Sequence, residues 1–141
     1  MVFFKIIIPS YNDARWLRKC LDSIKNQTFK DYEVVVVDDM STDNSVEIIK
    51  EYPFHLIVNN QKRYNGGTRN VGILYPIESK YTLFIDSDDW FYDENVFQTS
   101  GPGSVPGLMR AAVPTASLLS KDAVSSLQLA VGNFCPSCWA K

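Results

Sequence analysis

The hydrophobic positions of the first two thirds of the chain follow two periods that alternate. Apolar runs at residues 2–8, 33–37, 55–58 and 81–85 have strand length and many β-branched residues, as in strands buried on both faces of a parallel sheet. Residues 16–24 place apolar side chains at spacings of three and four after Asn12 or Asp13, and residues 41–52 do so after a cap at Ser41 or Thr42, which predicts two amphipathic helices.

A third, shorter helix is expected after Gly66-Gly67, ending before Pro76 because proline breaks helices. Strands and helices in strict alternation predict an α/β fold with a doubly wound, mainly parallel sheet. After about Phe97 the amino-acid composition changes, and residues 98–141 hold 4 Gly, 4 Pro and 7 Ser. The sequence therefore predicts one domain over residues 1–97 and a linker-like or non-native C-terminal tail over residues 98–141.

Polar segments follow the strands, where a doubly wound sheet binds its ligands. Pro9 ends the first strand, and Tyr11 offers a flat ring on which a base can stack. Asp38 and Asp39 leave the second strand, and two carboxylates beside an apolar interior need donors or a cation. They can accept hydrogen bonds from a uracil imide N–H or from ribose hydroxyls, or they can cap the helix that follows.

Two more candidate binding segments follow the third and fourth predicted strands. Gly66 and its neighbour allow a ligand to approach the backbone closely, and Arg69, in the first turn of the third helix, can contact phosphate or hold one of the acids. Asp86 and Asp88 are two residues apart at the end of the fourth strand, so their side chains can converge on one site. Three carboxylates within residues 86–89 favour a bridging Mg²⁺ or Mn²⁺.

Together these segments resemble the family 2 glycosyltransferases. The matching motifs are Ile6-Ile-Ile-Pro-Ser-Tyr-Asn12, Val37-Asp-Asp-Met-Ser-Thr-Asp-Asn-Ser45, Gly66-Gly-Thr-Arg-Asn70 and Asp86-Ser-Asp88. The resemblance implies a GT-A fold, a nucleoside-diphosphate-sugar donor with UDP as its expected nucleotide, and Mn²⁺ or Mg²⁺. It implies a donor site lined by Pro9, Tyr11, Asn12, Asp38, Asp39, Gly66, Arg69, Asp86 and Ser87, with Asp88 and Asp86 as metal ligands.

The resemblance also implies transfer with inversion to a hydroxyl of a saccharide or lipid-linked acceptor, for which a carboxylate takes the proton. Asp122 is the sole acid of residues 98–141, so we identify no catalytic base and expect the chain to hold a truncated GT-A fold. The alternative hypothesis is a non-catalytic fragment that binds nucleotide sugar without an acceptor half.

Composition narrows these hypotheses further. A net charge of −2 disfavours a nucleic-acid partner, and the Pro-Ser-Tyr-Asn segment disfavours a dinucleotide-binding enzyme, which needs a glycine-rich turn there. The sequence predicts a buried, reduced Cys20, whereas Cys135 and Cys138 lack the second ligand pair of a zinc site. No run is long enough to span a membrane. We therefore expect a cytoplasmic location, with peripheral membrane association open to the parent enzyme.

Overall fold

The computed structural model describes residues 1–97 and 112–118. Its sheet has the strand order β3-β2-β1-β4-β5. The four strands β1 (Val2–Ser10), β2 (Tyr32–Asp38), β3 (His55–Val58) and β4 (Ser79–Phe84) are parallel, and β5 (Val113–Pro114) pairs with β4 antiparallel. The predicted set of four parallel strands is confirmed.

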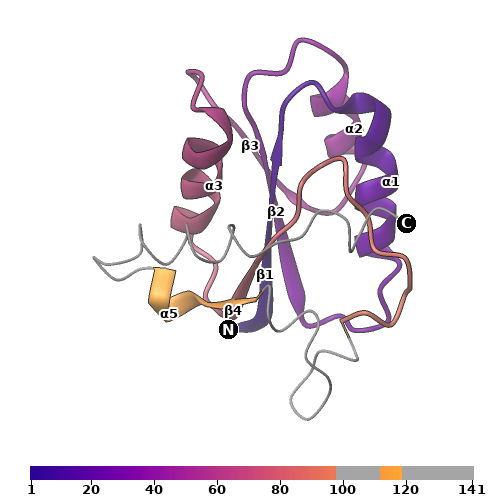
Figure 1. The fold of residues 1–141 in the computed structure, drawn as a ribbon, viewed down its shortest axis with the longest axis vertical. Helices are drawn as coiled ribbons and strands as arrows, with labels where there is room; N and C mark the ends of the chain where they lie inside the picture. The colour runs from indigo at the N-terminus through magenta and orange to yellow at the C-terminus, as the bar shows by residue number, and fades with distance from the viewer. Residues whose placement is uncertain (98–111, 119–141) are drawn as a thin grey trace.

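Helices cover both faces of the sheet, which confirms the doubly wound architecture (Figure 1). The helices α1 (Ala14–Lys25) and α2 (Ser45–Lys50) lie on one side and α3 (Tyr64–Leu74) lies on the other, while the short α5 (Thr115–Leu118) follows β5. Each crossover returns the chain so that the next strand runs in the same direction as the last. The carboxyl ends of β1, β2 and β4 therefore lie together at one end of the sheet.

The central strand β1 is apolar from Val2 to Ile8 except at Lys5, because both of its faces are covered. Ile6 and Ile8 pack in the cluster that contains the apolar side chains of α1 and α2, whereas Ile7 packs with Ile73 of α3. Full burial of one such side chain stabilises the fold by about 1.5–3 kcal/mol. A Cβ at Gly72 would lie 2.4 Å from Cγ2 of Ile7, so this glycine lets α3 sit directly on β1.

The exception to the apolar pattern of β1 is Lys5, which is 1% exposed on the α3 side. Its ammonium donates to the carbonyl oxygens of Ile73 at 2.8 Å and Tyr75 at 2.6 Å, at the carboxyl end of α3, where the helix dipole favours a cation. Burial lowers the pKa of Lys5. The lysine therefore fixes the distal end of the helix whose other end borders the cleft described below.

Two helix starts differ from the sequence prediction. α2 begins at Ser45 after Asn44, not at Ser41, because the Ser41 hydroxyl donates to Asp38 and is not a helix cap. α3 begins at Tyr64 and contains Gly66 and Gly67, which puts Arg69 in its second turn. The expectation of a glycine turn before α3 is wrong, because the turn is made by the residues before Tyr64.

Asp13 occupies the position before α1, as predicted, but its side chain makes no cap hydrogen bond. The carboxylate of Asp43 accepts from the Ala14 N–H instead, at 3.1 Å. The start of α1 is therefore stabilised by the loop that follows β2, and these two loops at the carboxyl end of the sheet support each other.

Part of the region predicted to be a linker-like or non-native tail extends the sheet. β5 pairs with β4, Ala112 is buried in the core on the α1 side, and Leu118 packs with Ile7 and Ile73. Nothing in the sequence indicated this strand, because two residues are too few to show the alternation of a strand. The high Gly, Pro and Ser content of the tail favoured a linker instead. Cys20 is buried and free, as predicted, whereas the Cys135 and Cys138 prediction lies outside the described residues.

Candidate nucleotide-sugar site

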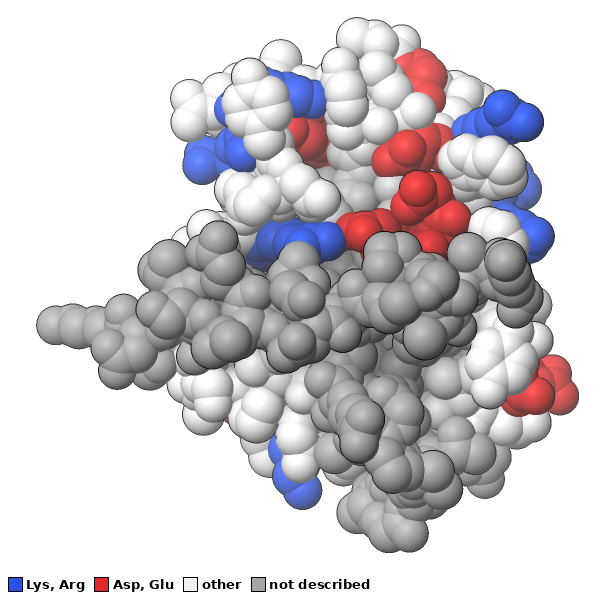
Figure 2. All heavy atoms as spheres, viewed as in Figure 1, with Lys and Arg blue, Asp and Glu red and all other residues white. Residues whose placement is uncertain are grey.

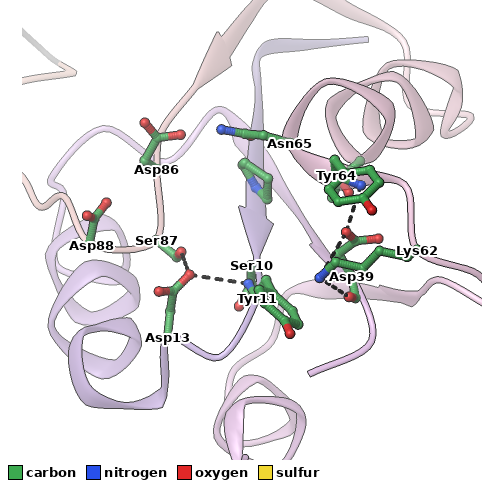
Figure 3. Close-up of a pocket in the computed structure, with 12 residues that line it drawn as sticks. Ser10, Tyr11, Asp13, Asp39, Lys62, Tyr64, Asn65, Asp86, Ser87 and Asp88 are labelled. Atoms are coloured by element: carbon green, nitrogen blue, oxygen red, sulfur yellow. Dashed lines mark hydrogen bonds and ion pairs between the residues drawn. The ribbon is translucent and has the colours of Figure 1, made fainter. Parts of the chain in front are cut away.

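A cleft of about 570 Å³ opens at the carboxyl ends of β1, β2 and β4 (Figure 3). Its position is the one predicted for a doubly wound sheet. The side chains that line it come from the loops after these strands and from the start of α3: Pro9, Ser10, Tyr11, Asp13, Asp39, Lys62, Tyr64, Asn65, Thr68, Asp86, Ser87 and Asp88. The structure thus brings Pro9, Tyr11, Asp39, Asp86, Ser87 and Asp88 of the predicted set together.

Asp39 is a buried carboxylate held by hydrogen bonds from a neighbouring loop. Its Oδ1 accepts from Asn59 Nδ2 and from the Arg63 N–H, both at 2.9 Å, and its Oδ2 accepts from the Tyr64 N–H at 2.8 Å. Burial alone would raise its pKa, but these hydrogen bonds and the nearby Lys62 ammonium hold the pKa below its ordinary value. Asp39 is therefore an ionised acceptor at neutral pH and also joins β2 to the start of α3.

Asp38 and Asn12 do not line the cleft. Both Asp38 oxygens are used within the loop after β2, by the Ser41 N–H at 2.9 Å and the Ser41 hydroxyl at 2.5 Å. Asn12 accepts from the Thr42 N–H at 2.7 Å, which links the loop after β1 to the loop after β2. Asp38 thus stabilises a turn before α2 and does not cap that helix, whose N-cap is Asn44. Its predicted contact with a ligand stays a prediction.

Tyr11 presents a half-exposed ring at the edge of the cleft, and the ammonium of Lys62 lies 2.7 Å from the centre of that ring. The same ammonium lies 3.4 Å from Asp39 Oδ2. An aromatic face, a cation and a carboxylate therefore share one end of the cleft. This combination suits a flat, polar, hydrogen-bonding group such as a nucleobase.

The other end of the cleft is acidic. Oxygen atoms of Asp86, Asp88 and Asp89 all lie within 4.8 Å of one another. Burial first, and then the charges of Asp88 and Asp86, raise the pKa of Asp89, which shows how these carboxylates repel each other. Figure 2 shows acidic side chains gathered in the middle of the face drawn there, with basic side chains to both sides. Hard oxygen ligands of this kind suit Mg²⁺ or Mn²⁺.

Arg69 of α3 contacts the acidic turn. Its Nη2 donates to Asp86 Oδ1 at 2.6 Å, which is one of the two roles that the sequence suggested for it. The bond is single and the buried Nε has no hydrogen-bond partner within the described residues. Neither Arg69 nor Gly66 lines the cleft, and a Cβ at Gly66 would point into open space. The close approach of a ligand to the Gly66 backbone therefore stays a prediction.

The predicted set lacks six of the lining residues: Ser10, Asp13, Lys62, Tyr64, Asn65 and Thr68. Asp13 was assigned only to the cap of α1, but its carboxylate accepts from the Ser87 hydroxyl and from the Tyr11 N–H. Four of them, Lys62, Tyr64, Asn65 and Thr68, lie between β3 and the middle of α3. The loop after β3 begins at the carboxyl end of the sheet, so its position was a signal, whereas Thr68 lies inside the Gly66–Asn70 motif and was given no role.

The mainly parallel sheet, the helices on both faces and the acidic turn after β4 define a protein of the GT-A glycosyltransferase class. The chain belongs to glycosyl transferase family 2, whose sequence model matches residues 5–99. It is 45% identical over 95 residues to glycosyltransferase GlyA of Streptococcus pneumoniae, covering 64% of this chain and 14% of the relative. It is 37% identical over 103 residues to the poly(ribitol-phosphate) β-N-acetylglucosaminyltransferase TarS of Staphylococcus aureus, covering 68% and 18%.

Solved structures of residues 1–349 of S. aureus TarS show the same fold. The complex with UDP-GlcNAc has a TM-score of 0.63 at 32% identity, and the complex with UDP has 0.64 at 30%; each match covers 70% of this chain and 30% of the other. The chain thus spans less than a fifth of the length of both sequence relatives. Within the described residues, no helix has the length and apolar character that crossing a membrane requires.

Proposed function

We propose that residues 1–97 are the donor-binding part of an inverting glycosyltransferase that takes a UDP-sugar with Mn²⁺ or Mg²⁺. The observation that carries the proposal is the distribution of groups in one cleft, with Tyr11 and Asp39 at one end and the Asp86–Asp88 turn at the other. S. aureus TarS, which was solved with UDP and with UDP-GlcNAc, supports the choice of nucleotide.

Asp39 has the capacity to read the base. A carboxylate offers about four acceptor positions, and Asn59, Arg63 and Tyr64 fill three of them. One position remains for a donor such as the uracil imide N–H. Because the hydrogen bonds keep the pKa of Asp39 low, the group accepts without first losing a proton, and its burial strengthens the interaction.

The acidic turn fits a divalent cation. Asp86 and Asp88 would hold it, and Asp89 lies close enough to add a third oxygen. A metal bound there supplies positive charge to the diphosphate leaving group. The chain itself orients these ligands, because Arg69 holds Asp86 and Asp13 holds the intervening Ser87. We propose a saccharide or lipid-linked hydroxyl as the acceptor of the whole protein.

Calorimetric titration of UDP into the 141-residue chain, with and without Mn²⁺, tests this function. We expect Mn²⁺ to strengthen binding and Asp88→Ala to reduce binding in Mn²⁺ to the metal-free level. Glu47→Ala removes an exposed acid on α2 outside the cleft and serves as the matched control, with unchanged binding. Folded wild-type protein that binds no UDP in either condition would overturn the proposal.

A further inference from the structure

Three non-glycine residues of the described chain have a left-handed backbone, and all three lie in loops or helix starts at the carboxyl end of the sheet. They are Asn12 with φ 52°, Met40 with φ 65° and Tyr64 with φ 58°. Asparagine tolerates this region, whereas a bulky residue such as tyrosine is rare there. Strain of this kind persists where surrounding contacts enforce it, and it gathers at functional sites.

The contact that enforces the conformation of Tyr64 comes from the cleft. Asp39 Oδ2 accepts from the Tyr64 N–H at 2.8 Å and Asp39 Oδ1 accepts from the Arg63 N–H. Glycine would satisfy the same hydrogen bond without strain. The backbone arrangement therefore explains why the position is left-handed, but it does not explain why the residue carries a large aromatic ring.

The ring itself is exposed and borders the cleft. Tyr64 is 73% exposed and lines the same cavity as Tyr11. In Figure 3 the Asp39 carboxylate and the Lys62 ammonium lie between the rings of Tyr11 and Tyr64. Lys62 lies over the Tyr11 ring, whereas no aromatic or cationic group of the described residues covers the Tyr64 ring. An uncovered aromatic face beside an acceptor that reads a base is suited to stacking.

We propose that Tyr64 is a nucleobase-binding residue. The pyrimidine base stacks on the uncovered Tyr64 ring, and Asp39, whose carboxylate lies beside that ring, accepts from the base. The inference rests on the proposed function, since it names the residue that reads the base in the same cleft. The left-handed residue thus places an aromatic side chain at the cleft while its N–H stays bound to Asp39.

The test separates the ring from the strain. UDP and the Mn²⁺–pyrophosphate complex, which lacks a base, are titrated into wild-type protein and into Tyr64→Gly, Tyr64→Ala and Tyr64→Phe. We expect UDP to bind roughly tenfold to hundredfold more weakly to the Gly and Ala variants, the range of one aromatic–base stack. The Phe variant should bind like wild type, and pyrophosphate affinity should be the same in all four proteins.

Thermal unfolding gives the second readout. Tyr64→Gly relieves the backbone strain, so its Tm should be no lower than that of wild type although UDP binding is weaker. Tyr92→Ala is the matched control, because Tyr92 is 86% exposed and lines a separate cavity near the end of α1; it should leave UDP binding unchanged.

The outcomes are distinguishable. Equal UDP affinity in wild type and Tyr64→Gly overturns the role of the ring and leaves the proposed function standing. Equal losses of UDP and pyrophosphate binding also overturn it, because the residue then acts on the site as a whole. Wild-type protein that binds neither probe overturns both the proposed function and this inference.

Discussion

The two ends of the cleft differ in how the chain satisfies their carboxylates. Asp39 is 3% exposed, and three N–H donors and a lysine surround it. The turn at residues 86–89 is more open, and there Arg69 holds Asp86 while the three carboxylates crowd together. Hydrogen bonds lower the pKa of Asp39, whereas burial and neighbouring negative charge raise the pKa of Asp89.

This difference indicates which carboxylate contributes to the stability of the fold as well as to ligand binding. A buried carboxylate with satisfied acceptor positions contributes to stability, because removing it leaves its donors unpaired. Carboxylates that repel each other contribute little or oppose folding until a cation joins them. We therefore expect Asp39 to couple folding and nucleotide binding, and Asp88 to affect binding alone.

The largest expected effect is on the free energy of unfolding. Asp39→Ala should destabilise the domain by about 3–5 kcal/mol, because it leaves the buried amide of Asn59 and the part-buried N–H groups of Arg63 and Tyr64 without an acceptor. Asp88→Ala, at an exposed position, should change stability by less than about 0.5 kcal/mol. Urea unfolding without metal measures both. Equal losses in the two variants would show that the acidic turn is as much a part of the fold as Asp39.

A smaller effect is expected from pH. The folded pKa of Asp39 is depressed below its ordinary value of 3.8, so its contribution is fully present above that value and is lost as pH falls through the folded pKa. A protonated carboxyl keeps part of its acceptor capacity, so this loss is smaller than that in Asp39→Ala. The measurement is urea unfolding of wild type and Asp39→Asn between neutral pH and pH 3.

The stability difference between these two proteins should stay constant near neutral pH and shrink in the acid range. Comparison with the Asn variant removes the contributions of the other carboxylates, which titrate in both proteins. A difference that stays constant down to pH 3 would show that the ionised form of Asp39 is no better bound in the folded state than in the unfolded chain.

The sequence predicted the sheet and both ends of the cleft because these depend on local pattern and on strand ends. Buried parallel strands are apolar along their whole length, so residues 2–8 and 33–37 were recognisable. The ends of parallel strands meet at one edge, so Asp39 and Asp86 could be assigned to one site. Both inferences need only the order of elements along the chain.

The remaining features depend on contacts between loops, which no local pattern encodes. The Asp43 carboxylate accepts from the Ala14 N–H at the start of α1. The predicted caps of that helix, Asn12 and Asp13, therefore make other hydrogen bonds. Asn12 and Asp38 match two motifs of the family, yet their side chains accept hydrogen bonds from the loop after β2. Tyr64 was invisible as a site residue because its role depends on a left-handed backbone that Asp39 enforces from another loop.

The smallest expected effect on stability concerns Arg69, the residue that connects the acidic turn to α3. The Arg69 side chain is 13% exposed, but that of its partner Asp86 is 46% exposed and stays hydrated when the pair is broken, so we expect a contribution of about 1 kcal/mol. Arg69→Gln should therefore unfold with nearly the wild-type free energy, and it should bind Mn²⁺ more tightly, since the turn gains net negative charge.

Arg18→Gln, which removes an exposed pair with Glu51, is the control and should leave Mn²⁺ affinity unchanged. Unfolding in urea and Mn²⁺ titration monitored by paramagnetic quenching of tryptophan fluorescence measure the two quantities. If Arg69→Gln destabilised the domain as strongly as Asp39→Ala, the acidic turn would prove to be built into the fold, and the contrast between the two ends of the cleft would fail.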